Sequence, residues 1–196
     1  LARDAGWTEV QLRTGFSAEM AERHAKLAKE AAKTDDEQGS MFPVSEYTAT
    51  QPLYYGDVSM KSFESEVVGA LPLTKDQGPK NASHAVILAS SAFYPEGGGQ
   101  EGDYGHLVQG DTTVHVLDTQ KVGNVILHMC SGALEVGESA TGHLDWKRRK
   151  QLMDHHTAVH IVGGAARRIL GPHIYQAGAN KSVESGRLDI THFNRL

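Results

Sequence analysis

The sequence predicts an α+β protein in which an N-terminal helical segment precedes a small β-barrel and then the start of a mixed α/β region. Three observations support this order. Residues 18–33 carry apolar side chains at helical spacing, residues 52–145 hold short β-rich runs between glycine turns, and residues 146–170 return to helical spacing. We therefore expect boundaries at 1–50, 51–146 and 147–196.

The first segment has the features of an amphipathic helix. Ser17 can cap its start, and Glu19 lies in the first turn, where the helix dipole favours an anion. Met20, His24 and Leu27 then share one face. A polar stretch at residues 34–40 predicts a loop after this helix.

The middle segment is predicted to be β-structure. Apolar or alternating runs at residues 84–89, 113–117 and 124–130 are separated by turns rich in glycine. Short strands at a spacing of about 8 to 12 residues are typical of a small barrel or sandwich.

The last segment begins with a helix near Trp146. Leu152, His156 and Val159 have helical spacing, and Gly171-Pro172 predicts the end of the helix. Residues 187–193 then read as the start of a strand.

Composition limits the class of protein. The 196 residues include 19 basic and 24 acidic side chains, so the net charge of −5 excludes a nucleic-acid footprint spread over the whole chain. Cys130 is the single cysteine, which excludes an internal disulfide and favours a reducing compartment. No apolar run approaches the roughly 18 residues of a membrane span. Because the first residue is Leu1 and not methionine, we expect a fragment of a longer protein.

His156 and His160 form the first candidate site. Residues i and i+4 share a helix face, so both imidazoles can reach one metal ion. The position after His156 is Thr157, where a zinc protease with this spacing has glutamate, so that class is disfavoured. A zinc site needs three or four protein ligands, so two histidines are half a site, and two ordinary histidines remain the alternative.

A glycine-rich stretch at residues 91–105 is the second candidate. Gly97 to Gly99 allow the backbone to approach a ligand closely, Gln100 adds an amide and Ser91 a hydroxyl. No Lys-Ser/Thr pair follows the glycines, so this is not a phosphate-binding P-loop. A glycine-rich hairpin loop is the alternative.

A basic run is the third candidate. Four cations beside Trp146 can meet a phosphate backbone and a stacked base. A solvated helix face is the alternative for a run of this length. These residues are Lys147, Arg148, Arg149 and Lys150.

In combination these motifs are far more specific. The chain carries Ser-Ala-Phe-Tyr-Pro-Glu-Gly-Gly-Gly-Gln, Gly-His-Leu-Asp-Trp, Asp-His-His-Thr-Ala-Val-His and Arg-Leu-Asp-Ile-Thr-His-Phe in that order. This order resembles the alanyl-tRNA synthetase family, in its archaeal form, and more narrowly the editing region shared with free-standing alanyl-tRNA editing proteins. Residues 50–196 carry the resemblance strongly, and residues 1–50 resemble the end of the tRNA-recognition region more weakly.

The resemblance implies a cytoplasmic class II ligase that attaches alanine to its tRNA with ATP and Mg²⁺, in a catalytic core whose motifs this chain lacks. The editing region hydrolyses alanine tRNA wrongly charged with serine or glycine. The resemblance places Gln100 and Ser91 in its pocket, Ser91 standing where the family commonly has threonine. It also makes His156 and His160 zinc ligands, completed by a downstream cysteine and histidine. Alanine tRNA is the implied partner, without a membrane, and a homodimer would form through other regions.

That downstream Cys-x-x-x-His is absent before Leu196. We therefore expect an internal fragment with half a zinc site, inactive in isolation. Two other interpretations stay open: a non-catalytic tRNA-binding or spacer module, and a free-standing deacylase that edits in trans.

Overall fold

The computed structural model describes residues 42–193, and the following concerns the compact unit that begins at Pro43. The helix expected after Ser17 lies outside the described residues. The predicted barrel and the predicted long helix are both confirmed, a combination of the α+β class.

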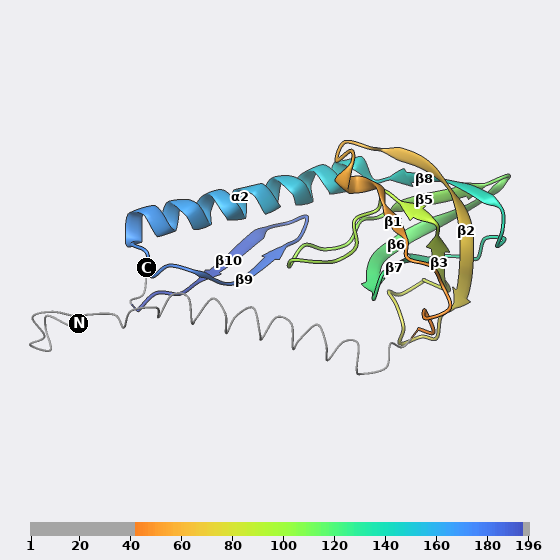
Figure 1. Ribbon diagram of the computed structural model, residues 1–196, viewed down its shortest axis with the longest axis horizontal. Coiled ribbons are helices and arrows are strands. Elements are labelled where there is room, and N and C mark those ends of the chain that lie inside the picture. Colours follow the sequence, from red (N-terminus) through yellow and green to blue (C-terminus); the bar gives the residue numbers. More distant parts are fainter. Residues whose placement is uncertain (1–41, 194–196) are drawn as a thin grey trace, which may run out of the picture. The chain divides into compact units, whose positions relative to one another are not determined.

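Six antiparallel strands close the barrel in the order β2-β3-β7-β6-β5-β8 (Figure 1). A short parallel pair and a one-turn 3₁₀ helix lie beside it: β1 (Gln51–Pro52), β4 (Ser90–Ser91) and η1 (Leu53–Tyr55). The bounds of the barrel strands are β2 (Ser62–Pro72), β3 (His84–Leu88), β5 (Gly105–Gln109), β6 (Thr112–Val122), β7 (Val125–Cys130) and β8 (Ser139–Leu144).

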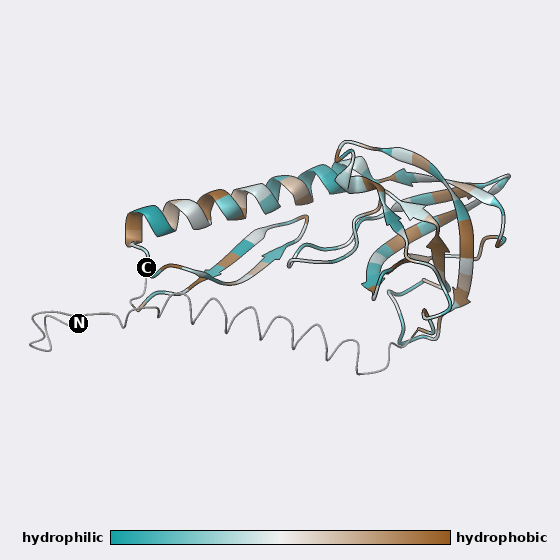
Figure 2. Cartoon of the chain, viewed as in Figure 1, coloured by the Kyte–Doolittle hydropathy of each residue, from teal (hydrophilic) through white to brown (hydrophobic). Residues whose placement is uncertain are grey.

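The alternation of side chains explains why these segments form a barrel. In β2, Phe63, Ser65 and Val67 are buried while the residues between them are exposed, as expected for a strand with one face toward the core. Strands β3 and β7 are buried almost throughout. Figure 2 shows the apolar residues that line these strands.

The long helix α2 (Trp146–Leu170) starts directly after β8 and ends at Gly171, as the sequence predicts. A hairpin of β9 (Gln176–Lys181) and β10 (Gly186–Ile190) packs along it (Figure 1). The first half of α2 has a buried face formed by Arg149, Leu152 and Val159. No helix in residues 42–193 is long and apolar enough to cross a membrane.

The side chain of Asp145 caps α2 by accepting a hydrogen bond from the backbone N–H of Arg148 at 3.1 Å. Replacing it with alanine leaves that donor unpaired, and we expect the free energy of unfolding to fall by about 1 kcal/mol. Asp145→Ser keeps a capping oxygen and should lose only a few tenths of a kcal/mol. Chemical denaturation followed by circular dichroism compares the two variants, and equal losses would contradict the capping role.

Candidate functional site

The glycine loop, residues 97–100, connects β4 to β5 and has the geometry of a tight hairpin turn. Gly97 and Gln100 exchange two backbone hydrogen bonds, of 3.0 and 2.9 Å. Gly98 and Gly99 between them have φ angles of +58° and +74°, which favour glycine and define a type I′ turn. A Cβ atom at Gly99 would also collide with the carbonyl oxygen of Ala179. The loop is therefore pressed against β9 where no side chain fits.

The turn directs the side chain of Gln100 toward α2. Gln100 is 4% exposed, and its Oε1 lies 2.8 Å from Nδ1 of His156. Because an amide oxygen only accepts hydrogen bonds, Nδ1 carries the proton and Nε2 keeps its lone pair. Gln100 thus sets the tautomer of His156 and leaves Nε2 free to accept a proton or bind a metal ion.

His160 lies one turn further along α2. Its ring stacks on that of His156 with centroids 5.0 Å apart and an interplanar angle of 27°, so the spacing does put both imidazoles on one face. Burial lowers the pKa of His156, and the charge of Lys181 and the neighbouring His160 lower it further. A neutral imidazole is the form that binds metal ions. Among residues 42–193 no group of three or more His, Cys, Asp or Glu side chains is placed to hold a metal ion.

A cavity of about 270 Å³ opens beside this pair. Gln100, Arg149 and His156 supply polar groups to its wall, and three aromatic rings supply apolar surface. Those rings belong to Tyr54, Tyr55 and Tyr94. His160 lines a second cavity of about 210 Å³ between α2 and the β9–β10 hairpin. The two imidazoles therefore face neighbouring cavities.

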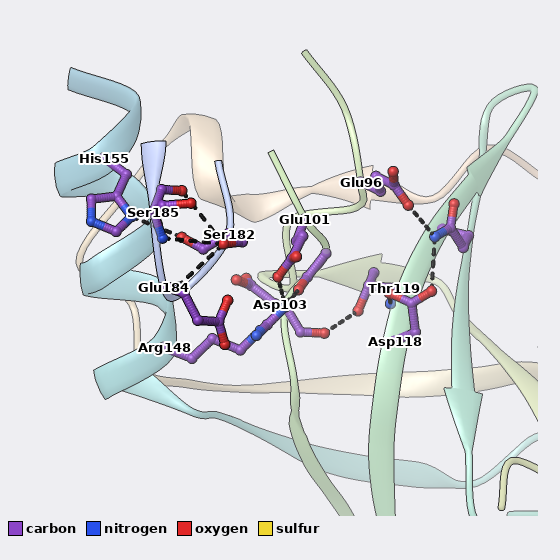
Figure 3. Close-up of polar contacts among 12 residues, drawn as sticks. Glu96, Glu101, Asp103, Asp118, Thr119, Arg148, His155, Ser182, Glu184 and Ser185 are labelled. Atoms are coloured by element: carbon purple, nitrogen blue, oxygen red, sulfur yellow. Dashed lines mark hydrogen bonds and ion pairs between the residues drawn. The ribbon is translucent and has the colours of Figure 1, made fainter. Parts of the chain in front are cut away.

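The basic run does not form one exposed patch. Arg148 donates to the carboxylate of Glu101 at 2.8 Å (Figure 3). It also donates to the carbonyl of Gly102 and lies over the ring of Tyr104. Lys150 pairs with Asp154 at 2.6 Å and, like Lys147, is exposed. Two of the four cations thus remain on the surface, which leaves a smaller phosphate-binding area than the sequence suggests.

Arg149 is the buried member of the run. It is 4% exposed, and its Nε lies 2.7 Å from Oδ2 of Asp103, itself 1% exposed. A second donor, Nη2, bonds to the carbonyl of Ala92 at 2.5 Å. Burial raises the pKa of Asp103, and the charge of Arg149 opposes the rise. Arg149 therefore joins α2 to the glycine-rich stretch, and it also lines the first cavity.

Ser91, in β4 beside the barrel, is buried against β7 and is not on the wall of the cavity. It is fully buried, its hydroxyl is 2.8 Å from Nε2 of His128, and it accepts the N–H of Phe93 at 3.1 Å. Cys130 is also in the core, and burial raises its pKa to about 12. Of the residues singled out from the sequence, the structure brings together Gln100, His156, His160 and Arg149.

Sequence reasoning missed several residues at this site. Tyr54 and Tyr55 gave no signal because aromatic residues outside a motif usually belong to the core, and Tyr94 stood in the glycine-rich motif without an assigned role. Asp103 stood in the glycine-rich motif without a role, although an acidic residue there could have been matched to a cation of the basic run. Lys181, which contacts the glycine loop, sits in a polar strand and reads as an ordinary surface lysine.

Comparison of the sequence with known proteins shows the family of the chain. The family model of class II tRNA synthetases of the alanine type matches residues 2–148, three quarters of the chain. The chain belongs to the alanyl-tRNA synthetase family.

Similar relatives are archaeal alanine–tRNA ligases. The protein of Ignicoccus hospitalis is 37% identical over 201 residues, covering 100% of this chain and 21% of its own length. Those of Pyrobaculum aerophilum and Halorubrum lacusprofundi are 40% and 39% identical and cover 94% and 100% of the chain. The chain spans about a fifth of the length of these synthetases.

Proposed function

We propose that this chain is the β-barrel and front part of the editing region of an alanyl-tRNA synthetase and that, within the complete protein, it serves the hydrolysis of alanine tRNA mischarged with serine or glycine. The observation that carries the proposal is the 2.8 Å contact between Gln100 and His156 beside a cavity lined by tyrosines. In this proposal residues 1–50 end the tRNA-recognition region, 51–146 form the barrel and 147–196 begin the editing domain.

The need for a second site follows from the size of the amino acids. Serine exceeds alanine by one hydroxyl, which an apolar pocket rejects only about 10²-fold, and glycine is smaller and fits. A separate hydrolytic site corrects both errors. Water adds to the ester carbonyl, the bond to the ribose oxygen breaks, and the amino acid and the tRNA with a free hydroxyl leave.

The chain's own residues prepare this site. The cavity takes the end of the tRNA against its aromatic rings, which stack on bases. Gln100 holds the proton of His156 at Nδ1 and so keeps Nε2 unprotonated toward the reacting ester. The buried Arg149 keeps α2 against the glycine-rich stretch.

The donor set fits a zinc ion in part. His156 and His160 supply two imidazoles on one face, and the hydrogen bond from His156 to Gln100 is the kind of outer contact that orients a zinc-binding histidine. Two ligands fall short of the three or four that zinc takes in proteins. When bound, the ion would hold and polarise the aminoacyl ester.

The activities of the complete protein are part of the same proposal. It would attach alanine to its tRNA with ATP and Mg²⁺ in a class II core, act in the cytoplasm and bind alanine tRNA. A homodimer would form through regions other than this chain.

We expect the His156→Ala variant of the complete gene product to hydrolyse serine-charged alanine tRNA at least about 100-fold more slowly, because it loses the imidazole at the reacting centre. Hydrolysis is measured from radiolabelled aminoacyl-tRNA with zinc present, and alanine-charged tRNA is the substrate control. Attachment of alanine by the same variant should be unchanged.

His155→Ala is the matched control on the same helix. The Nδ1 atom of His155 lies 2.7 Å from the carbonyl oxygen of Ser182, in the β9–β10 turn, so this ring is engaged away from Gln100 (Figure 3). Its hydrolysis rate should stay within about threefold of the wild-type rate. Wild-type rates in His156→Ala would refute the proposed site.

A further inference from the structure

Lys181, at the end of β9, forms three hydrogen bonds with the glycine loop and with Glu101, the residue that follows it. Its Nζ donates to the carbonyl of Gly98 at 2.7 Å, and its backbone N–H donates to that of Gly99 at 2.6 Å. Its own carbonyl accepts the N–H of Glu101 at 3.1 Å. Lys181 therefore spans the loop from before to after Gln100.

The charge of Lys181 is buried without a carboxylate partner. The residue is 1% exposed, and within residues 42–193 no carboxylate lies within ion-pair distance of its ammonium. Burial lowers its pKa. A buried ammonium without an opposite charge costs stability, whereas a methionine of similar length would not. Stability alone does not explain a lysine at this position.

The loop that Lys181 holds is the one that orients His156. In the sequence, Gln100 is flanked by the residues that bond to Lys181: Gly98 and Gly99 before it and Glu101 after it. The side chain of Gln100 contacts Nδ1 of His156. A Cβ atom at Gly98 would lie 4.0 Å from Cε1 of His156, so the backbone of the loop is itself next to the imidazole. Movement of the loop would shift Gln100 against His156.

We propose that Lys181 is a positioning residue for the hydrolysis, because its ammonium holds the Gly98 carbonyl and thereby fixes Gln100 against His156. The catalytic part of this inference rests on the proposed function. The holding of the loop does not, because it follows from the contacts of Lys181 alone.

The test is Lys181→Met in the complete gene product, which keeps an unbranched side chain of similar length and removes the donor. We expect kcat for hydrolysis of serine-charged alanine tRNA to fall about 10- to 100-fold, as when an orienting contact is lost. KM should change less than about threefold, since the three tyrosines that line the cavity are unaltered. Tm should be unchanged or higher. Lys181→Arg, which restores a donor and the charge, should recover part of kcat.

Hydrogen exchange supplies a measurement independent of activity. Amides of residues 98–101 should exchange faster in Lys181→Met than in the wild type and return toward the wild-type rate in Lys181→Arg. Lys75→Met makes the same chemical change at an exposed lysine in the loop between β2 and β3, outside the candidate site, and should alter neither kcat nor this exchange.

The possible outcomes separate the two proposals. An unchanged kcat in Lys181→Met, or a kcat that falls only together with Tm, would overturn the positioning role. If the wild-type protein hydrolyses no mischarged tRNA, the proposed function fails and exchange alone decides whether Lys181 holds the loop. If the amides of residues 98–101 then exchange at the wild-type rate in Lys181→Met, the proposal that Lys181 holds the loop is overturned as well.

Discussion

Arg149→Met is expected to lower the free energy of unfolding by about 3 to 5 kcal/mol, because it leaves the Asp103 carboxylate buried without its partner. Arg149 and Asp103 are both buried, at most 4% exposed, and the distance from Nε of Arg149 to Oδ2 of Asp103 is 2.7 Å. Asp103 also accepts a hydrogen bond from the N–H of Tyr94 at 2.8 Å, which the variant keeps. The carbonyl of Ala92 loses its hydrogen bond from Arg149 in the variant. Urea denaturation followed by circular dichroism measures the loss.

A double variant distinguishes the buried charge from lost packing. Asp103→Asn keeps an acceptor for Tyr94 but removes the negative charge, so Asp103→Asn combined with Arg149→Met should be more stable than Arg149→Met alone. Lys150→Met is the matched control, since its exposed pair with Asp154 contributes at most about 1 kcal/mol. A loss below about 1 kcal/mol in Arg149→Met would mean that the pair is not important for the fold.

Local periodicity explains what the sequence could predict. The spacing of Leu152, His156 and Val159 defines α2, and the same i, i+4 rule places His160 beside His156. Glycine turns separate the β-rich runs that became β3, β6 and β7. These features depend on neighbours within a few residues, which a single sequence displays.

Contacts between distant residues explain what the sequence did not show. Arg149 and Asp103 are 46 positions apart, so the sequence gives no sign that these two residues form an ion pair. The helical spacing of Arg149 and Leu152 was the one available signal, since it places Arg149 on the buried face. The side chain of Ser91 points toward His128, 37 positions away, because the two form a hydrogen bond. The side chain of Lys181 likewise points toward the carbonyl of Gly98, 83 positions away.

His128 joins the barrel core through a chain of hydrogen bonds that requires a neutral ring. The carbonyl of Val86, 2.9 Å from Nδ1, only accepts, so Nδ1 carries the proton. Nε2 then accepts from the hydroxyl of Ser91, whose oxygen in turn accepts the N–H of Phe93. Protonation of Nε2 would place a charge in the core and oppose the hydroxyl donor. Burial accordingly lowers the pKa of His128 from 6.5 to about 4.

The barrel is therefore expected to lose stability as the pH falls from about 6.5 to about 4. In this range His128 binds a proton in the unfolded chain but stays neutral in the folded barrel. This contribution of His128 to stability is complete above the ordinary pKa of histidine, and its loss amounts to about 3 kcal/mol at the acid end of this range.

His128→Asn keeps a donor toward Val86 and cannot titrate. It should be less stable than the wild type at pH 7.5 but lose about 2 kcal/mol less on transfer to pH 4.5. His115→Asn, at an exposed histidine of β6, is the control and should retain the wild-type pH dependence of urea denaturation. Parallel pH profiles for wild type and His128→Asn would show that His128 is not the group responsible.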